Sequence, residues 1–112
     1  MDQWPEVTIT TMKHVIDTSE LLGVISTREG SREICATAEA QYTSDATQLE
    51  IWLDAFLRTT DLRTKESRSP APWLPKSEII RESIGPNEAA ELARDIFHRW
   101  VRKVRDASPP PA

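Results

Sequence analysis

The amino-acid sequence predicts an α+β domain in which an antiparallel three-stranded meander is packed by two helices, the longer one C-terminal. Three observations favour this class: residues 34–42 alternate apolar and polar, residues 6–12 are β-branched, and residues 86–106 have an amphipathic helical period. The competing interpretation is an all-α bundle, because residues 34–56 also carry apolar side chains at helical spacing in an Ala-, Glu- and Gln-rich context.

The expected strands follow one another in the first part of the chain. Residues 6–12 alternate with the period of a half-buried strand that can extend toward Ile16. Residues 21–27 form the second strand, and Gly30 can supply the positive φ of a hairpin loop. Residues 34–42 are then the third strand, so the three make an antiparallel meander.

A first helix is expected over 45–60, capped by Ser44 and Asp45. Ile51 falls outside its apolar arc, beside Arg58, and is expected to be exposed. The arc consists of Ala46, Leu49, Trp52, Leu53, Phe56 and Leu57.

A connection without an apolar period follows at 61–75, and its three prolines argue against a regular element. Within it, 71–74 is a candidate fourth strand at the sheet edge, where proline is tolerated. Residues 77–82 are expected to form a short helical turn. A chain of 112 residues suits one hydrophobic core, so we expect a single domain over 1–107 and a disordered Pro-rich tail over 108–112.

The last helix is expected to begin at Pro86, because proline is favoured in the first turn. Its apolar residues span about 180°, wider than the roughly 100° that one-sided burial requires. We therefore expect a second covering surface, from this chain or from another copy. The arc consists of Ala89, Ala90, Leu92, Ala93, Ile96, Phe97, Trp100, Val101 and Val104.

Composition narrows the class of protein. The hydrophobic content of 38% and charged content of 29% are those of a soluble globular chain. No apolar run approaches the roughly 20 residues that cross a bilayer, and no secretion signal is evident, so we expect a cytoplasmic protein without membrane contact. Net charge is −4, but residues 67–112 carry eight basic and six acidic side chains.

The sequence contains no recognisable catalytic, metal or cofactor motif. Cys35 is the only cysteine, and His14 and His98 are far apart in sequence, which does not match metal-ligand spacing. Cys35 alternates out of the apolar register of its strand and is expected to be an ordinary thiol. The prediction is therefore a non-enzymatic protein that needs no cofactor.

The function we expect is that of a protein-interaction module or small regulatory adaptor, self-associating as a homodimer through apolar helix surface. A tryptophan held between prolines also suits docking into a groove. The expected interaction residues are Trp73, Leu74, Phe97, Trp100 and Val101.

The alternative function is nucleic-acid binding, because cations at helical spacing on the last helix could contact phosphates. Part of this charge is expected to be neutralised within the helix. Asp95 is spaced to pair with Arg99. Arg102 is spaced to pair with Asp106 in the same way. The candidate phosphate-contacting residues are Arg94, His98, Arg102 and Arg105.

Overall fold

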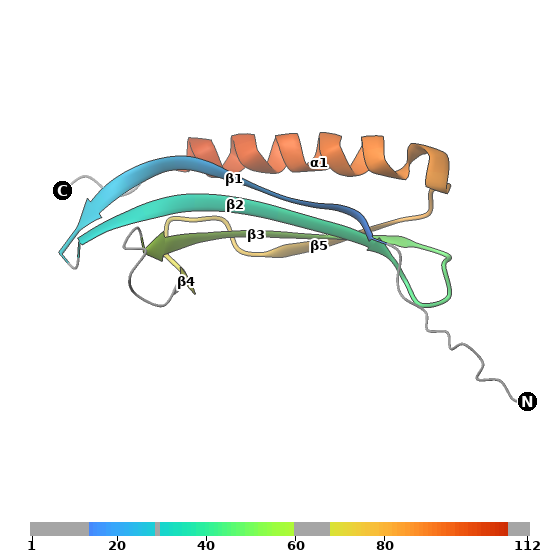
Figure 1. Cartoon of the computed structure of the whole chain (residues 1–112), viewed down its shortest axis with the longest axis horizontal. Coiled ribbons are helices and arrows are strands. Elements are labelled where there is room, and N and C mark those ends of the chain that lie inside the picture. The colour runs from blue at the N-terminus through green and yellow to red at the C-terminus, as the bar shows by residue number, and fades with distance from the viewer. Residues whose placement is uncertain (1–13, 29, 60–67, 108–112) are drawn as a thin grey trace, which may run out of the picture.

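The computed structural model describes residues 14–28, 30–59 and 68–107, which form one antiparallel sheet with a helix packed on one face (Figure 1). Three long strands make a meander, and two short strands pair with the outer edge of the third. The elements are β1 (His14–Thr27), β2 (Gly30–Tyr42), β3 (Leu49–Thr59), β4 (Arg68–Ser69), β5 (Glu78–Glu82) and α1 (Pro86–Asp106). The α+β class is confirmed and the all-α alternative is wrong.

The sheet face toward α1 is built from alternate residues of β2 and β3. Ala36, Ala38 and Ala40 of β2 are buried, as the alternation over 34–42 predicts. Their β3 partners, among them Ile51 and Leu53, are buried in the same core. Because alanine side chains are short, α1 approaches this part of the sheet closely, with Cα atoms within 8 Å of β2.

The helix expected over 45–60 is wrong, because β3 occupies most of those residues. Ile51 is fully buried and Trp52 is 47% exposed, the reverse of the expected helical arc. Leu49, Leu53 and Leu57 are four residues apart, a spacing that satisfies both the helical and the strand period. Pairing with β2 along the whole strand buries one face of β3 and decides between the two. The two-helix arrangement is therefore not confirmed, and the described residues contain one helix.

Asp45 lies in the turn between β2 and β3 and does not begin a helix. Its Oδ1 accepts hydrogen bonds from the Thr43 hydroxyl (2.6 Å), the Thr47 hydroxyl (2.8 Å) and the Thr47 backbone N–H (3.2 Å). Ala46 completes the turn in the left-handed region with φ of 59°. The bonds from Thr43 and then Thr47 favour the ionised carboxylate, so they lower the pKa of Asp45.

We expect Asp45→Asn to reduce stability at neutral pH and to have less effect in acid. The folded-state pKa lies below the unfolded-state value, so the stabilisation is complete above the unfolded pKa. It is lost as the pH falls through the folded pKa. Urea unfolding of both proteins, from neutral pH into strong acid, measures the difference. A difference that does not shrink with acidification would contradict this origin.

The first part of the meander agrees more closely with the prediction from the sequence. The strand expected over 21–27 is confirmed as the second half of β1. Gly30 begins β2 with φ of +115°, opposite Thr27, as a hairpin loop requires. The strand expected over 6–12 lies outside the described residues, and so does the expected tail, 108–112. The expected extension of that strand toward Ile16 belongs to β1, so the separation of this strand from 21–27 is wrong within the described residues.

The expected edge strand and helical turn after residue 70 are both wrong. Residues 72–73 form a turn, in which the Leu74 N–H donates to the Ala71 carbonyl at 3.0 Å. The edge strands lie before and after this turn, as β4 and β5. Residues 77–82 contain two adjacent isoleucines, which are β-branched, and the edge of β3 offers them backbone partners.

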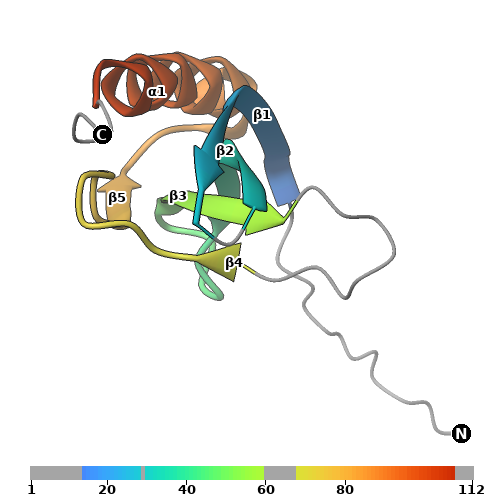
Figure 2. The same cartoon turned by 90° about the vertical axis from the view of Figure 1, so that its left-hand side faces the viewer.

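The start of α1 is confirmed, with Gly85 extended at the N-cap and Pro86 in the first turn. Most of its apolar arc is buried by the chain's own sheet. Viewed along the strands, the sheet curves beneath the helix, with β1 and β5 on opposite sides (Figure 2). A curved sheet covers a wider arc than a flat one. The buried helix residues are Ala89, Ala93, Ile96, Phe97, Trp100, Val101 and Val104.

No helix of the described residues lies over the other face of the sheet. Cys35 and Phe56 are paired neighbours on this face and are both buried. The Arg68 guanidinium lies over the Phe56 ring, 4.4 Å from its centre, and so covers part of this face. The exposed large hydrophobic residues of the described chain all belong to this face or its margins: Leu21, Val24, Trp52 and Ile79.

Candidate protein-interaction groove

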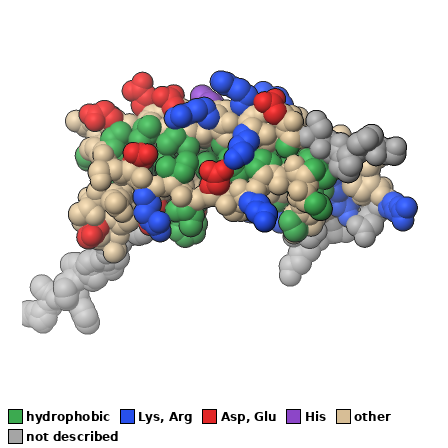
Figure 3. All heavy atoms as spheres, turned by 180° about the vertical axis from the view of Figure 1, so that it is seen from behind, with side chains coloured by type: hydrophobic (Ala, Val, Ile, Leu, Met, Phe, Trp, Pro, Cys, Tyr) green, Lys and Arg blue, Asp and Glu red, His purple; other side chains and the backbone are tan. Residues whose placement is uncertain are grey.

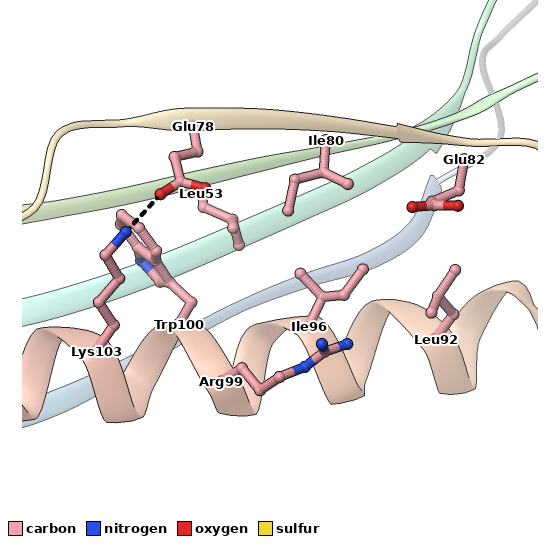
Figure 4. Close-up of a pocket in the computed structure, with 9 residues that line it drawn as sticks. All are labelled: Leu53, Glu78, Ile80, Glu82, Leu92, Ile96, Arg99, Trp100 and Lys103. Atoms are coloured by element: carbon pink, nitrogen blue, oxygen red, sulfur yellow. Dashed lines mark hydrogen bonds and ion pairs between the residues drawn. The ribbon is translucent and has the colours of Figure 1, made fainter.

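A groove of about 320 Å³ runs between α1 and β5. Seen from behind, hydrophobic side chains gather in a band below the charged outer side of the helix (Figure 3). In close-up, the groove residues project toward one another from the two elements, with β3 beneath (Figure 4). The lining consists of Leu53, Glu78, Ile80, Glu82, Leu92, Ile96, Arg99, Trp100 and Lys103.

The groove exists because α1 packs on only part of the sheet. Its Cα atoms come within 8 Å of β1, β2 and β3, but not of β5. Side chains project into the space between α1 and β5 but do not fill it. Ile80 from the strand and Leu92 from the helix each remain half-buried there, whereas Ile96 and Trp100 below them are buried. The result is an apolar groove that solvent reaches at Ile80 and Leu92.

Opposite charges line the rims of the groove. Near one end, Lys103 Nζ bridges to Glu78 Oε2 at 2.8 Å and lies 5.7 Å from the centre of the Trp100 ring. Glu82 on the strand lies at the other end, beside Leu92, and Arg99 on the helix lies between the two ends (Figure 4). Neither of these two makes an ion pair with another residue of the described chain. They are therefore available to a ligand.

β5, whose side chains line one wall of the groove, has an outer edge that no described strand pairs with, because the pairing of β5 in the described chain is with β3. Its register with β3 is regular over five residues. β1, at the opposite edge of the sheet, has two irregularities in its pairing, and such bulges discourage the addition of another strand. A regular edge beside an apolar groove is thus found at β5.

The residues expected to bind a partner lie mostly inside the protein. Phe97, Trp100 and Val101 are buried on the side of α1 that faces the sheet, and Trp100 also contributes to the floor of the groove. Leu74 is buried and Trp73 is half-buried against the same core, so the Pro-rich segment folds back as a lid. The apolar arc that suggested a dimer is covered by the chain's own sheet, which removes that argument. Homodimerisation stays a prediction.

The candidate phosphate-contacting residues Arg94, His98, Arg102 and Arg105 are all exposed on α1. Arg105 is bound to Glu20 of β1 at 3.1 Å. The expected ion pairs of Asp95 with Arg99 and of Arg102 with Asp106 are absent from the described residues. The helix instead directs Lys103 and Arg105 to the sheet, where their ion pairs join α1 to β5 and β1.

Cys35 is buried in the sheet. Within the described ranges, no three His, Cys, Asp or Glu side chains gather as metal ligands. No helix of those ranges has the length and apolarity needed to cross a bilayer. Comparison with known proteins finds no matching family model, no similar curated protein and no similar solved structure.

Sequence reasoning missed β5, and with it the groove. The signal was present in Ile79 and Ile80, a β-branched pair flanked by charged residues. Five residues are too few to distinguish strand from helical turn by period alone. The position of α1 relative to β5 depends on long-range packing, which no local pattern encodes.

Proposed function

We propose that this chain is a non-enzymatic protein-interaction module that binds a segment of another protein in the groove between α1 and β5. The observation that carries the proposal is an apolar groove beside an edge strand, β5, whose outer edge is paired by no described strand. The volume of the groove is at the lower end of the range for ligand sites and is enough for one or two aliphatic side chains.

The chemistry of the groove supports a peptide rather than a reaction. The floor is aliphatic and aromatic, and the rims carry the Lys103–Glu78 ion pair and the separate charges of Arg99 and Glu82. Burying an apolar side chain from a partner would supply affinity, and the charged rims would supply selectivity.

A random peptide library displayed on phage and panned on the wild-type protein tests this proposal. Peptides from the selection are synthesised with a fluorescent label, and anisotropy gives Kd for each variant. Ile80→Lys places a charge in the groove, and we expect affinity to fall roughly 10- to 100-fold, the value of one buried aliphatic side chain.

Ile79→Lys is the matched control, because it makes the same change one residue away on the opposite face of β5. Its affinity should stay within about twofold of wild type, since a surface substitution distant from the contact has little effect. Leu92→Lys repeats the test from the helix wall, and thermal melting reports folding of each variant. Folded Ile80→Lys and Leu92→Lys proteins that bind every selected peptide as wild type does would refute the proposal.

A further inference from the structure

We infer that the bound segment joins the sheet as a strand beside β5, with an aliphatic side chain opposite Ile80 and a lysine or arginine opposite Glu82. This inference rests on the proposed function of the groove. It adds the binding mode and the chemistry of the partner.

The alternation of β5 determines which side chains meet the groove. Glu78, Ile80 and Glu82 line it, whereas Ile79 and Arg81 belong to the other face, where Arg81 is bound to Glu50 at 2.9 Å. An added strand would continue this alternation, so its own residues at every second position would face the groove. Five paired residues correspond to a segment of about 17 Å.

The charges on the groove face specify the partner. Glu78 is already neutralised by Lys103, whereas Glu82 has no ion pair within the described chain. A cation directly opposite Glu82 would form a favourable cross-strand pair. The residue opposite Ile80 would continue the apolar surface formed by Ile80 and Leu92, and an aliphatic side chain suits that position.

A second copy of β5 is a poor occupant of this edge. Antiparallel pairing centred on Ile80 would place Glu78 of each copy opposite Glu82 of the other. Like charges directly opposite one another destabilise a strand pair. Charge complementarity therefore favours a different protein with a basic residue at that position.

Backbone methylation of a selected peptide tests strand addition. In an edge strand only every second N–H bonds to its neighbour. We expect N-methylation at alternate residues to weaken binding by about fivefold or more, with little effect at the residues between them. Losses spaced three or four residues apart, or no positional pattern, would overturn the inference.

A charge exchange tests the partner's chemistry. Glu82→Lys should weaken binding of the basic peptide about fivefold, and replacing that basic residue with glutamate should restore it. Glu91→Lys changes net charge equally on the exposed outer side of α1 and should leave Kd unchanged. Equal effects of both variants, without restoration by the acidic peptide, would contradict the assigned pairing.

These results separate the inference from the proposed function. If Ile80→Lys abolishes binding but methylation shows no alternation, the groove binds peptides and strand addition is wrong. If Ile80→Lys has no effect, the groove itself is wrong as a binding site. Concentration-dependent dimerisation of wild-type protein that Ile80→Lys abolishes would identify a second copy as the occupant and refute a heterologous partner.

Discussion

Trp100→Ala should lower the free energy of unfolding by about 3–5 kcal/mol, in line with deletions of buried aromatic side chains. Trp100 is 3% exposed and packs between α1 and the sheet. Its Nε1–H also donates to the Asp54 carbonyl at 2.9 Å. The substitution removes a large apolar volume and also leaves that carbonyl without this donor. Urea or guanidinium unfolding, followed by circular dichroism, measures the loss.

Trp100→Phe separates the two contributions. It retains most of the apolar volume but removes the indole N–H, so we expect an intermediate loss of about 1–3 kcal/mol. Trp52→Phe provides the matched control, because that indole is half exposed and its hydrogen bond to Glu50 is long, at 3.4 Å. A loss below about 1 kcal/mol for Trp100→Ala would mean that α1 does not pack on the sheet through this side chain.

Ile51→Ala should cost about 2–5 kcal/mol, whereas Trp52→Ala, at the adjacent position, should cost about 1 kcal/mol or less. Ile51 is fully buried on the helix-facing side of β3, opposite Ala40. Trp52 points to the other face and is 47% exposed. The smaller side chain should therefore have the larger effect, because burial rather than size determines the cost.

The order of these two effects distinguishes a strand from a helix over this segment. A helix over 45–60 would bury Trp52 and expose Ile51, and would reverse the two losses. Equilibrium unfolding of both variants decides between the arrangements. A Trp52→Ala loss that exceeds the Ile51→Ala loss would contradict the structure of β3.

The last helix and the strand over 34–42 were predicted from the sequence, although 34–42 also fits a helical spacing. The last helix combines a strong period with Pro86 in its first turn, and both its type and its start are confirmed. The alternation over 34–42 also held, with Ala36, Ala38 and Ala40 on the buried face. In these segments the local pattern and the tertiary environment favour the same structure.

The segments that form β3 and β5 were not predicted as strands. Leu49, Leu53 and Leu57 fit either a helix or a strand, and the pairing of β3 with β2 selected the strand. β5 is short, and it becomes a strand where the edge of β3 supplies backbone partners. The groove depends on both results, because it requires β5 at the edge and α1 positioned over the other strands.

By itself, the amino-acid sequence determined the long C-terminal amphipathic helix and which side of that helix is apolar, and it favoured strands earlier in the chain over an all-α bundle. Only the tertiary structure decided what covers the helix and what remains open. The curved sheet buries most of the apolar arc, and small alanines in β2 bring α1 close to it. Beyond β3 the same helix does not reach β5, and their unfilled separation leaves the groove.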